Sequence, residues 1–309
     1  MSGARPLTML VPAAAAPNGH DSMSETDLTG KVAIVTGGGG GMGRVIALAL
    51  AERGARVAAL DIRRAEAEAV AEAGARVADS EAVLPLAADV TQESDCGEAV
   101  QKTIDAFNRL DILVNAAGLG MQTLRDDYWK EPVRFWQCDP DGWQRMMDVN
   151  WKGAFLMARA SAPHMIAEGW GRIVNITTSL DTMTFAGYTP YGPSKAALEA
   201  ATSGWAKDLA DTGVTVNVLV PGGPVNTDFI PAAAPFDRAG LIQPEVMAAP
   251  ICWLASDASD GVTGRRFVAR DWDPALPAEA AAEAAGGPAA WPDAGKKAYR
   301  PAAKPTGSA

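Results

Sequence analysis

Long apolar runs, paired cysteines and histidines are all scarce in this chain, and each shortage excludes a class of protein. The 309 residues contain no run of about 18 apolar residues, so we expect no membrane-spanning helix. The three cysteines, Cys96, Cys138 and Cys252, are odd in number and widely spaced, which fits a reducing compartment and no disulfide framework. Because His20 and His164 are the only histidines, a His-rich zinc site is excluded and a Ser-His-Asp triad would depend on His164 alone.

Basic charge is also in short supply. Lysine and arginine total 27 against 37 aspartates and glutamates, which gives a net charge of −10. So acidic a chain gains nothing from a phosphate backbone, and we expect no nucleic-acid partner. Apolar residues, by contrast, make up 48% of the chain, which is enough to form a core.

The first 27 residues are rich in Ala, Pro, Ser and Gly and show no periodicity, which is typical of a flexible extension. The stretch from Arg5 to Ala16 resembles a signal peptide, but Pro6 and Pro12 break it and its positive charge is minimal. We therefore interpret residues 1–27 as a flexible extension of a cytoplasmic protein, with secretion as the alternative.

Short runs of Val, Ile and Leu alternate with amphipathic stretches from residue 31 to residue 272. The runs predict strands at 32–35, 56–60, 83–86, 112–114, 172–176, 214–220 and 266–269, and the amphipathic stretches predict helices at 42–53, 93–107, 141–166, 191–209 and 244–254. This alternation predicts a doubly wound parallel α/β sheet of the Rossmann type, with about seven strands and helices on both faces. We expect one domain at 28–272 and an Ala/Pro-rich tail at 273–309, with a candidate short helix at 277–285.

The first predicted strand leads into a glycine-rich turn, Thr36 to Gly43, which precedes a helix. Glycines let the backbone approach a pyrophosphate, and the helix N-terminus offers free N–H groups. The second strand ends at Asp61, whose carboxylate can accept hydrogen bonds from a ribose 2′-hydroxyl and would repel a 2′-phosphate. We therefore predict an NAD site. Arg63 and Arg64 could soften the preference over NADP, and a solvated strand-end aspartate is the alternative.

Tyr191 and Lys195 are four residues apart at the start of a predicted helix, so they share one face. An ammonium beside a phenol lowers the pKa of the tyrosine and makes it a usable acid and base. Such a pair also arises by chance on a solvated helix. Here it follows a buried strand that ends in Thr177, Thr178 and Ser179, which favours a reacting centre.

Taken together, these motifs resemble the short-chain dehydrogenase/reductase family, of the single-domain type, over Leu28 to Val268. Thr36, Gly37, Gly41 and Gly43 match its TGxxxGxG turn, and Tyr191 and Lys195 match its YxxxK motif. The other matches, in chain order, are Asp89-Val90, Asn115-Ala116-Ala117-Gly118, Asn150, Pro221-Gly222 and Thr227.

The resemblance implies an NAD-dependent oxidoreductase that interconverts a secondary alcohol and a ketone, with no metal, as a homotetramer or homodimer. Tyr191 would exchange a proton with the substrate oxygen, Lys195 would bind the nicotinamide ribose and keep the Tyr191 pKa low, and Asn150 would continue a proton relay through water. The family's polarising serine falls at Thr178, with Ser179 as the substitute. With Asp61, the expected cofactor-binding residues are Thr36, Gly37, Gly41, Met42, Gly43, Asp89, Val90, Asn115, Ala116, Gly118, Tyr191, Lys195, Pro221, Gly222 and Thr227.

The sequence departs from the family pattern in three further places. The segment 119–149 is about ten residues longer than expected and carries Tyr128, Trp129, Phe135, Trp136 and Trp143. These aromatics could cover an apolar or ring-bearing substrate, or could pack against the protein's own surface or a neighbouring subunit. An extra residue precedes Thr227, and residues 267–272 replace the family's usual closing segment, which puts the last strand's pairing in doubt.

Other features leave the substrate open. Phe185 and Tyr188 are candidate pocket walls, and residues 229–241 are a candidate mobile lid. The same machinery could act on a sugar, a 3-oxoacyl thioester or a C=C bond, because fold does not decide the substrate. A different class of function is an NAD-binding sensor or scaffold that has lost turnover.

Overall fold

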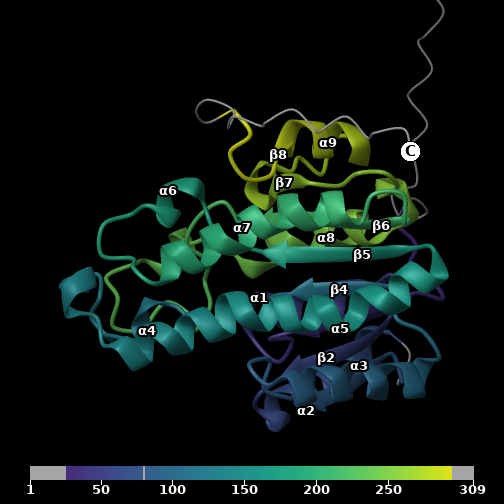
Figure 1. The fold of residues 1–309 in the computed structure, drawn as a ribbon, viewed down its shortest axis with the longest axis horizontal. Helices are drawn as coiled ribbons and strands as arrows, with labels where there is room; N and C mark the ends of the chain where they lie inside the picture. Colours follow the sequence, from purple (N-terminus) through teal and green to yellow (C-terminus); the bar gives the residue numbers. More distant parts are fainter. Residues whose placement is uncertain (1–25, 79–80, 294–309) are drawn as a thin grey trace, which may run out of the picture.

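The computed structural model describes residues 26–78 and 81–293, in which an eight-stranded sheet has helices on both faces (Figure 1). Nearly all of the predicted N-terminal extension, and residues 294–309 of the predicted tail, lie outside the described residues. Within the described ranges, no helix is long and apolar enough to cross a membrane.

The strand order is β3-β2-β1-β4-β5-β6-β7-β8, which confirms the doubly wound arrangement. The strands are β1 (Val32–Thr36), β2 (Arg56–Asp61), β3 (Val83–Ala87), β4 (Ile112–Asn115), β5 (Gly171–Ile176), β6 (Val214–Val220), β7 (Arg265–Val268) and β8 (Gly286–Pro288). The first seven pair in parallel, and their carboxyl ends share one edge. The order reverses between β1 and β4, where ligands of such sheets bind.

The helices that cover the sheet are mostly those predicted. They are α1 (Gly41–Glu52), α2 (Arg64–Val77), α3 (Glu93–Phe107), α4 (Pro140–Met147), α5 (Gly153–Glu168), α6 (Leu180–Met183), α7 (Tyr191–Asp208), α8 (Ala248–Ala255) and α9 (Ala278–Ala285). Helix α2 was not predicted, because its buried stripe consists only of Ala67, Val70 and Gly74, too small to give a clear apolar period. The single helix predicted at 141–166 is α4 and α5 joined by a π-helical segment, Asp148–Lys152.

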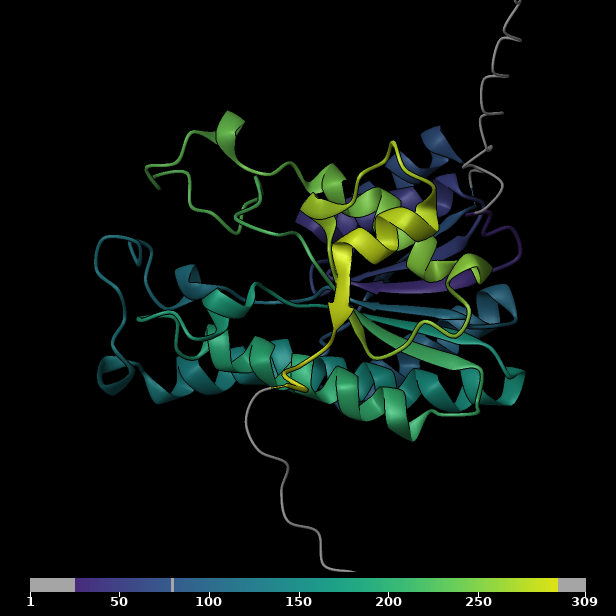
Figure 2. The ribbon, with the colours of Figure 1, turned by 90° about the horizontal axis from the view of Figure 1, so that it is seen from above.

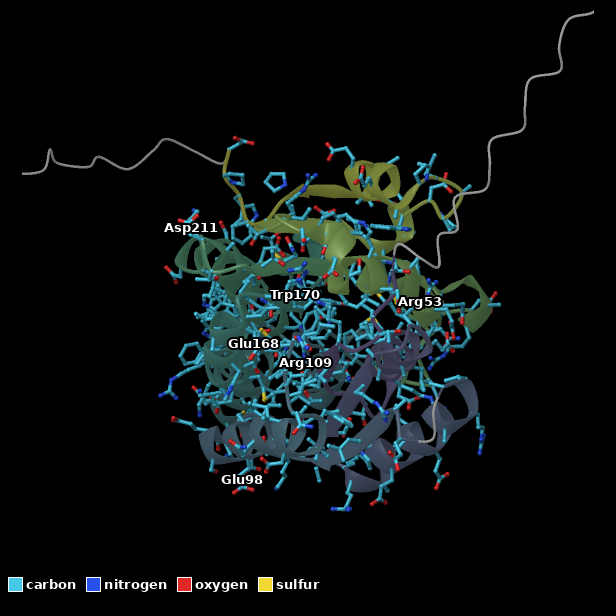
Figure 3. The ribbon with its side chains drawn as sticks, turned by 90° about the vertical axis from the view of Figure 1, so that its right-hand side faces the viewer. Arg53, Glu98, Arg109, Glu168, Trp170 and Asp211 are labelled. Atoms are coloured by element: carbon cyan, nitrogen blue, oxygen red, sulfur yellow. The ribbon has the colours of Figure 1, made fainter. Side chains whose placement is uncertain are left out.

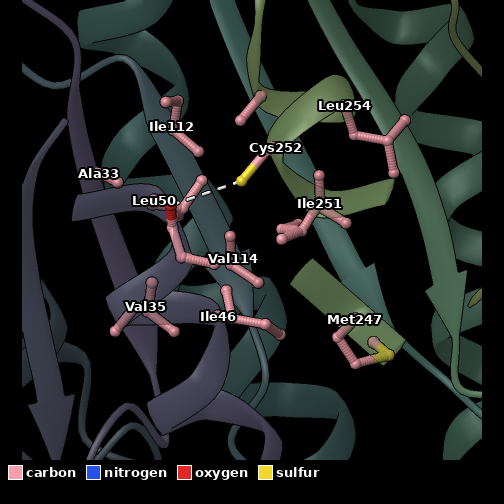
Figure 4. Packing of buried hydrophobic residues seen from close by; sticks show 14 of the residues in the cluster. Ala33, Val35, Ile46, Leu50, Ile112, Val114, Met247, Ile251, Cys252 and Leu254 are labelled. Atoms are coloured by element: carbon pink, nitrogen blue, oxygen red, sulfur yellow. Dashed lines mark hydrogen bonds between the residues drawn. The ribbon is translucent and has the colours of Figure 1, made fainter. Parts of the chain in front are cut away.

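The core lies on both faces of the sheet. On one face, Ile46 and Leu50 of α1 pack with Ile251 of α8 against Val35 and Val114 (Figure 4). On the other, Leu113 and Ile173 of the sheet pack with side chains of α3 and α5, among them Val100 and Met157. Cys252 is buried in the first of these clusters and acts as a small core hydrophobe.

Figure 3 views the molecule from the amino ends of the strands, opposite the edge where ligands bind, with Arg109 and Trp170 labelled. There the Arg109 guanidinium pairs with buried Asp111, whose carboxylate also accepts the Val32 N–H at 2.8 Å. The Lys31 Nζ and the Arg172 Cζ lie over the Trp170 ring, 3.4 and 4.1 Å from its centroid. The charged groups at this end of the sheet form structural contacts with one another and with the backbone. The candidate reactive residues lie at the carboxyl ends of the strands.

The C-terminal region adds to the sheet. The predicted short helix is confirmed as α9, and β7 pairs in parallel with β6 as the family pattern requires. Strand β8 then pairs antiparallel with β7, which makes eight strands where about seven were expected. Its sequence, Gly-Gly-Pro, has no strand propensity, so only the tertiary structure could reveal it.

Candidate active site

The turn between β1 and α1 requires glycine at two positions. Gly37 has φ +64°, and a Cβ there would lie 2.8 Å from the Ala117 Cα. A Cβ on Gly43 would lie 2.1 Å from the Gly37 carbonyl oxygen. Gly40, which caps α1, carries no side chain, so the first N–H groups of the helix point outward uncovered. The turn is packed tightly against its neighbours and leaves bare backbone for an anion.

Two further segments meet this turn. The Thr36 hydroxyl accepts hydrogen bonds from the N–H groups of Ala116 and Ala117 at 3.0 and 3.1 Å, which ties the end of β1 to the end of β4. A Cβ on Gly41 would lie 3.4 Å from the Thr227 methyl carbon, so the segment after β6 reaches the turn despite its extra residue. The structure therefore places Thr36 against the segment after β4, and Gly41 against Thr227.

Asp61 is 8% exposed at the end of β2, which overturns the alternative of a solvated aspartate. Its carboxylate accepts the N–H groups of Gly39 at 3.3 Å and Arg63 at 3.0 Å. The Arg63 guanidinium lies 3.4 Å from Glu66 through its Nη1 and 3.8 Å from the Asp61 carboxylate through its Nε, and Arg64 pairs with Glu68 at 2.7 Å. Arg63 therefore partly offsets the negative charge of Asp61, while Arg64 pairs with a different carboxylate.

The remaining cofactor-binding candidates form backbone and packing contacts at the edge of the sheet. The Asp89 carboxylate accepts the Thr91 N–H at 2.9 Å, and Val90 is buried against Gly153, where a Cβ would be 2.7 Å from a Val90 methyl. Gly222 has φ +96°, and the Pro221 carbonyl accepts the Arg270 N–H at 3.1 Å. These contacts shape the edge of the sheet around the glycine turn.

The side chain of Asn115 connects β4 to β5. Its amide Nδ2 donates to the side-chain Oδ1 of Asn175 at 2.9 Å, and the Asn175 Nδ2 donates to the Thr202 hydroxyl at 2.9 Å. The Asn115 Oδ1 is buried and has no partner among the described residues. The turn that follows it, Ala116 to Gly118, is what reaches the glycine turn and the centre described next.

A dinucleotide fits this arrangement. The bare N-terminus of α1 suits a pyrophosphate, and the buried carboxylate of Asp61 suits a ribose. Side chains on Gly37 and Gly43 would collide with backbone, so the close approach that a pyrophosphate needs is built into the turn.

The π-helical segment places Asn150. The side chain is 1% exposed; its Oδ1 accepts the Leu119 N–H at 2.7 Å, and its Nδ2 donates to the Leu119 carbonyl at 2.9 Å and to the Ser194 hydroxyl at 3.0 Å. A Cβ on Gly118 would lie 3.4 Å from the Asn150 Oδ1 and 3.5 Å from the Lys195 Nζ. The extra residue of the π-helical turn therefore brings the Asn150 side chain next to Gly118 and Lys195. Such π-bulges are frequent at functional sites.

Lys195 is buried, and its Nζ donates to the Ile176 carbonyl at 2.9 Å. Burial lowers the pKa of Lys195 to about 8, because the charged form loses hydration. At pH 7, which lies below this pKa, most copies of the Lys195 side chain are still in the charged ammonium form.

This buried charge makes stability depend on pH. The pKa of Lys195 is lower in the folded protein than the ordinary value of 10.5, so the unfolded chain binds more protons between pH 8 and 10 and the free energy of unfolding rises with pH there. We expect Lys195→Met to raise the free energy of unfolding by about 2 kcal/mol at pH 7 and to lose this advantage by pH 10. Denaturant unfolding across this range measures it. Lys207→Met, at an exposed position of the same helix, is the matched control, and parallel pH curves for wild type and Lys195→Met would refute the prediction.

Tyr191 begins α7, and the Thr178 hydroxyl lies beside its phenol. Burial raises the pKa of Tyr191 to about 12, and the contact with Thr178 opposes this rise. The expectation that Lys195 lowers the pKa of Tyr191 below its usual value is therefore wrong in this structure. The ammonium is bound to the Ile176 carbonyl, and loss of hydration at the phenol has the larger effect.

Ser179 is occupied elsewhere. It caps α6, accepting the Thr182 N–H at 3.2 Å, and its hydroxyl lies 2.6 Å from the Thr182 hydroxyl. Of the two hydroxyls between which the sequence could not decide, the one that contacts Tyr191 is that of Thr178.

Aromatic rings surround Tyr191. Its ring centroid is 6.3 Å from that of Tyr188 and 6.0 Å from that of Phe229, and Tyr188 is 6.0 Å from Tyr128 of the long segment. Phe135 and Trp136 of that same segment are 72% and 69% exposed and contact each other at the surface. The long segment thus contributes part of its aromatic residues to the site and leaves this pair in solvent.

The segment around Phe229, a candidate lid, is held at its base. Val225 and Ile242 form a β-bridge, and the Arg238 guanidinium donates to the carbonyls of Thr227 at 3.1 Å and Ile230 at 2.6 Å. Figure 2 shows this segment and the 119–139 segment projecting on the same side of the molecule, beyond the carboxyl ends of the strands.

Comparison with known proteins gives consistent matches. A model of the short chain dehydrogenase family matches residues 31–235. The 3-oxoacyl-[acyl-carrier-protein] reductase of Synechocystis sp. is 33% identical over 250 residues, covering 78% of this chain and 96% of that protein. A short-chain type dehydrogenase/reductase of Picea abies is 34% identical, covering 77% and 90%.

Two solved structures agree with the fold. A short-chain type dehydrogenase/reductase from Mycobacterium marinum has a TM-score of 0.71 at 28% identity and covers 80% of this chain and 97% of its own. A 3-ketoacyl-(acyl-carrier-protein) reductase from Brucella melitensis, complexed with NADH, has a TM-score of 0.66 at 29% identity, covering 77% and 95%.

Proposed function

The chain belongs to the short-chain dehydrogenase family, a family of oxidoreductases, and on that basis we propose that it interconverts a secondary alcohol and a ketone with NAD. The observation that carries this proposal is the cluster at the end of β5: the buried Lys195 ammonium, one helical turn from Tyr191, donates to the Ile176 carbonyl at 2.9 Å and lies with Asn150 around Gly118. An acid, a hydrogen-bond donor and a buried ammonium meet beside a glycine turn that fits a dinucleotide. A silent sensor has no need of all three.

The chain's own residues handle the proton. With a pKa of about 12 the Tyr191 phenol is protonated at neutral pH, so in the reductive direction it donates its proton to the carbonyl oxygen of the substrate. The Thr178 hydroxyl lies beside the phenol and polarises the same oxygen. Lys195, still largely protonated, stabilises the phenolate that forms, and Asn150 beside it continues the path by which the proton is replaced. A bound nicotinamide supplies the hydride that reduces the carbonyl carbon.

Asp61 supports the choice of NAD. A buried carboxylate at the end of β2 repels a ribose 2′-phosphate. We expect Asp61→Asn, which removes the charge and keeps one acceptor oxygen, to lower the preference for NAD over NADP at least tenfold, or about 1.4 kcal/mol. The ratio of kcat/KM with the two cofactors measures this. Glu66→Gln removes a nearby half-buried charge and should change the ratio far less, and an unchanged ratio in Asp61→Asn would exclude the role proposed for Asp61.

The aromatic residues beside Tyr191 support an apolar or ring-bearing substrate, because Tyr188 and Phe229 flank the reacting phenol. A second candidate is a 3-oxoacyl thioester, since the Synechocystis and Thermotoga maritima relatives carry the name of 3-oxoacyl-[acyl-carrier-protein] reductase. Turnover of NADH with cyclic and aryl ketones against 3-oxoacyl thioesters of matched length decides between the two. NADPH in parallel tests the cofactor.

We also propose that the protein is a cytoplasmic homo-oligomer that binds small molecules. Cys96 and Cys252 are buried free thiols, which suits a reducing compartment. Helix α5 exposes Phe155 (42%) and Ile166 (43%), which supports a contact with a second copy, a homodimer or homotetramer. Sedimentation velocity measures the oligomer directly.

A further inference from the structure

A buried ion pair lies beneath the end of β5. Glu199 of α7 is 0% exposed and Arg266 of β7 is 9% exposed, with 2.8 Å between the Glu199 Oε2 and the Arg266 Nη1. Glu199 follows Lys195 by four residues, so it continues the face of α7 that carries the reacting centre. Burial of both charges is costly unless their other atoms are also bonded, so the remaining contacts of the pair indicate its role.

Those contacts hold the end of β5. The Glu199 Oε2 accepts a hydrogen bond from the Thr177 hydroxyl at 2.9 Å. The Arg266 Nη2 donates to the Thr178 carbonyl at 2.8 Å. The ion pair therefore bonds the side chain of Thr177 and the backbone carbonyl of Thr178. With its carbonyl held by Arg266, the Thr178 side chain contacts Tyr191.

The C-terminal segment 286–290 completes this arrangement. The second carboxylate oxygen of Glu199 accepts the Ala290 N–H at 3.3 Å. Ala290 has φ +62°, a left-handed conformation that residues other than glycine adopt rarely. Antiparallel pairing holds the segment there: Arg266 is opposite Gly287, and the Ala289 N–H donates to the Gly264 carbonyl at 2.9 Å.

We propose that Glu199 and Arg266, together with the C-terminal segment 286–290, are positioning residues that fix the Thr178 hydroxyl against the Tyr191 phenol. This inference rests on the proposed function, in which Thr178 and Tyr191 handle the substrate oxygen. It also gives the strand β8, which lies outside the matched residues 31–235, a role in the site. The pair explains why Thr178, and not Ser179, faces the phenol.

The first test separates positioning from stability. Arg266→Met should lower kcat about 10- to 100-fold and leave the Kd for NADH within threefold, because the glycine turn is untouched. The single variant leaves the Glu199 carboxylate buried without its cation, so its Tm should fall. In the double variant Glu199→Gln/Arg266→Met the buried charge is gone and Tm should recover, while kcat stays low. Recovery of kcat together with Tm would show a merely structural pair and overturn the proposal.

The second test does not depend on turnover. With [13Cζ]tyrosine, the Tyr191 resonance is assigned by its loss in Tyr191→Phe. Arg266→Met should shift this resonance in the same direction as Thr178→Val, because both remove the hydroxyl from the phenol. If wild type turns over none of the ketones or thioesters, the proposed function fails, and this resonance still decides the positioning claim. An unmoved resonance in Arg266→Met overturns it.

Ala290 tests the part played by the C-terminal segment. Ala290→Gly keeps the N–H and accepts φ +62°, so kcat and the Tyr191 resonance should match wild type. Ala290→Pro removes the N–H that Glu199 accepts and cannot adopt that φ, so kcat should fall severalfold and the resonance should move as in Arg266→Met. Wild-type behaviour of Ala290→Pro in both measurements would exclude the segment from the positioning role.

Discussion

Tyr191→Phe is expected to lower kcat about 10³-fold while the affinity for NADH stays within threefold of wild type. The substitution removes one oxygen, and that oxygen is the proton donor that contacts Thr178. The ring remains to pack against Tyr188 and Phe229, so the site should keep its shape. Steady-state kinetics in the reductive direction, with cofactor binding followed by quenching of tryptophan fluorescence, measures both quantities.

Tyr188→Phe is the matched control for this experiment. Tyr188 lies beside Tyr191 and also loses a hydroxyl, but that hydroxyl interacts with Tyr128. We expect less than a tenfold change in kcat. Equal losses in the two variants would mean that Tyr191 contributes to the aromatic packing and not to proton transfer.

Gly43→Ala should weaken dinucleotide binding at least about 100-fold, or roughly 2.7 kcal/mol. The new Cβ would lie 2.1 Å from the Gly37 carbonyl oxygen and 2.7 Å from its carbon, both in the backbone of the turn. The turn must shift to relieve this overlap, and the N–H groups of α1 shift with it. Titration of the protein with NADH, with Tm measured alongside, shows the loss.

Gly40→Ala controls for the loss of a glycine in the same turn. A Cβ there has the Arg63 Nη2 as its nearest neighbour, 3.9 Å away, and φ is −150°. Binding of NADH should stay within threefold of wild type. If Gly43→Ala and Gly40→Ala bind equally well, the turn does not hold the pyrophosphate.

The sequence predicted the parts of this protein whose signals are local. Buried parallel strands such as β1 and β4 are mostly continuous apolar runs, and Tyr191 and Lys195 are brought together by helix geometry alone. Asp61 could be placed because a strand ends there. In each case the evidence lies within a few residues of the position it concerns.

The remaining features depend on contacts between distant segments. The π-helical segment at Asn150 has no sequence signature of its own, and the side chain that it places there is bonded to Leu119, 31 residues away. The pKa of Tyr191 follows from how deeply the phenol is buried, which the spacing to Lys195 does not determine. The pairing of Glu199 with Arg266 joins residues 67 positions apart. Such features are set by tertiary packing and could be found only in the structure.

The most direct test of the proposed function follows the hydride itself. Wild-type protein is supplied with NADH deuterated at the transferable C4 position and with the ketones and 3-oxoacyl thioesters above, and the alcohol formed is analysed by mass spectrometry. We predict one deuterium on the carbinol carbon with wild type and a rate about 10³-fold lower with Tyr191→Phe. Tight binding of NADH with no deuterated product from any substrate would contradict the account and indicate a dinucleotide-binding sensor or scaffold.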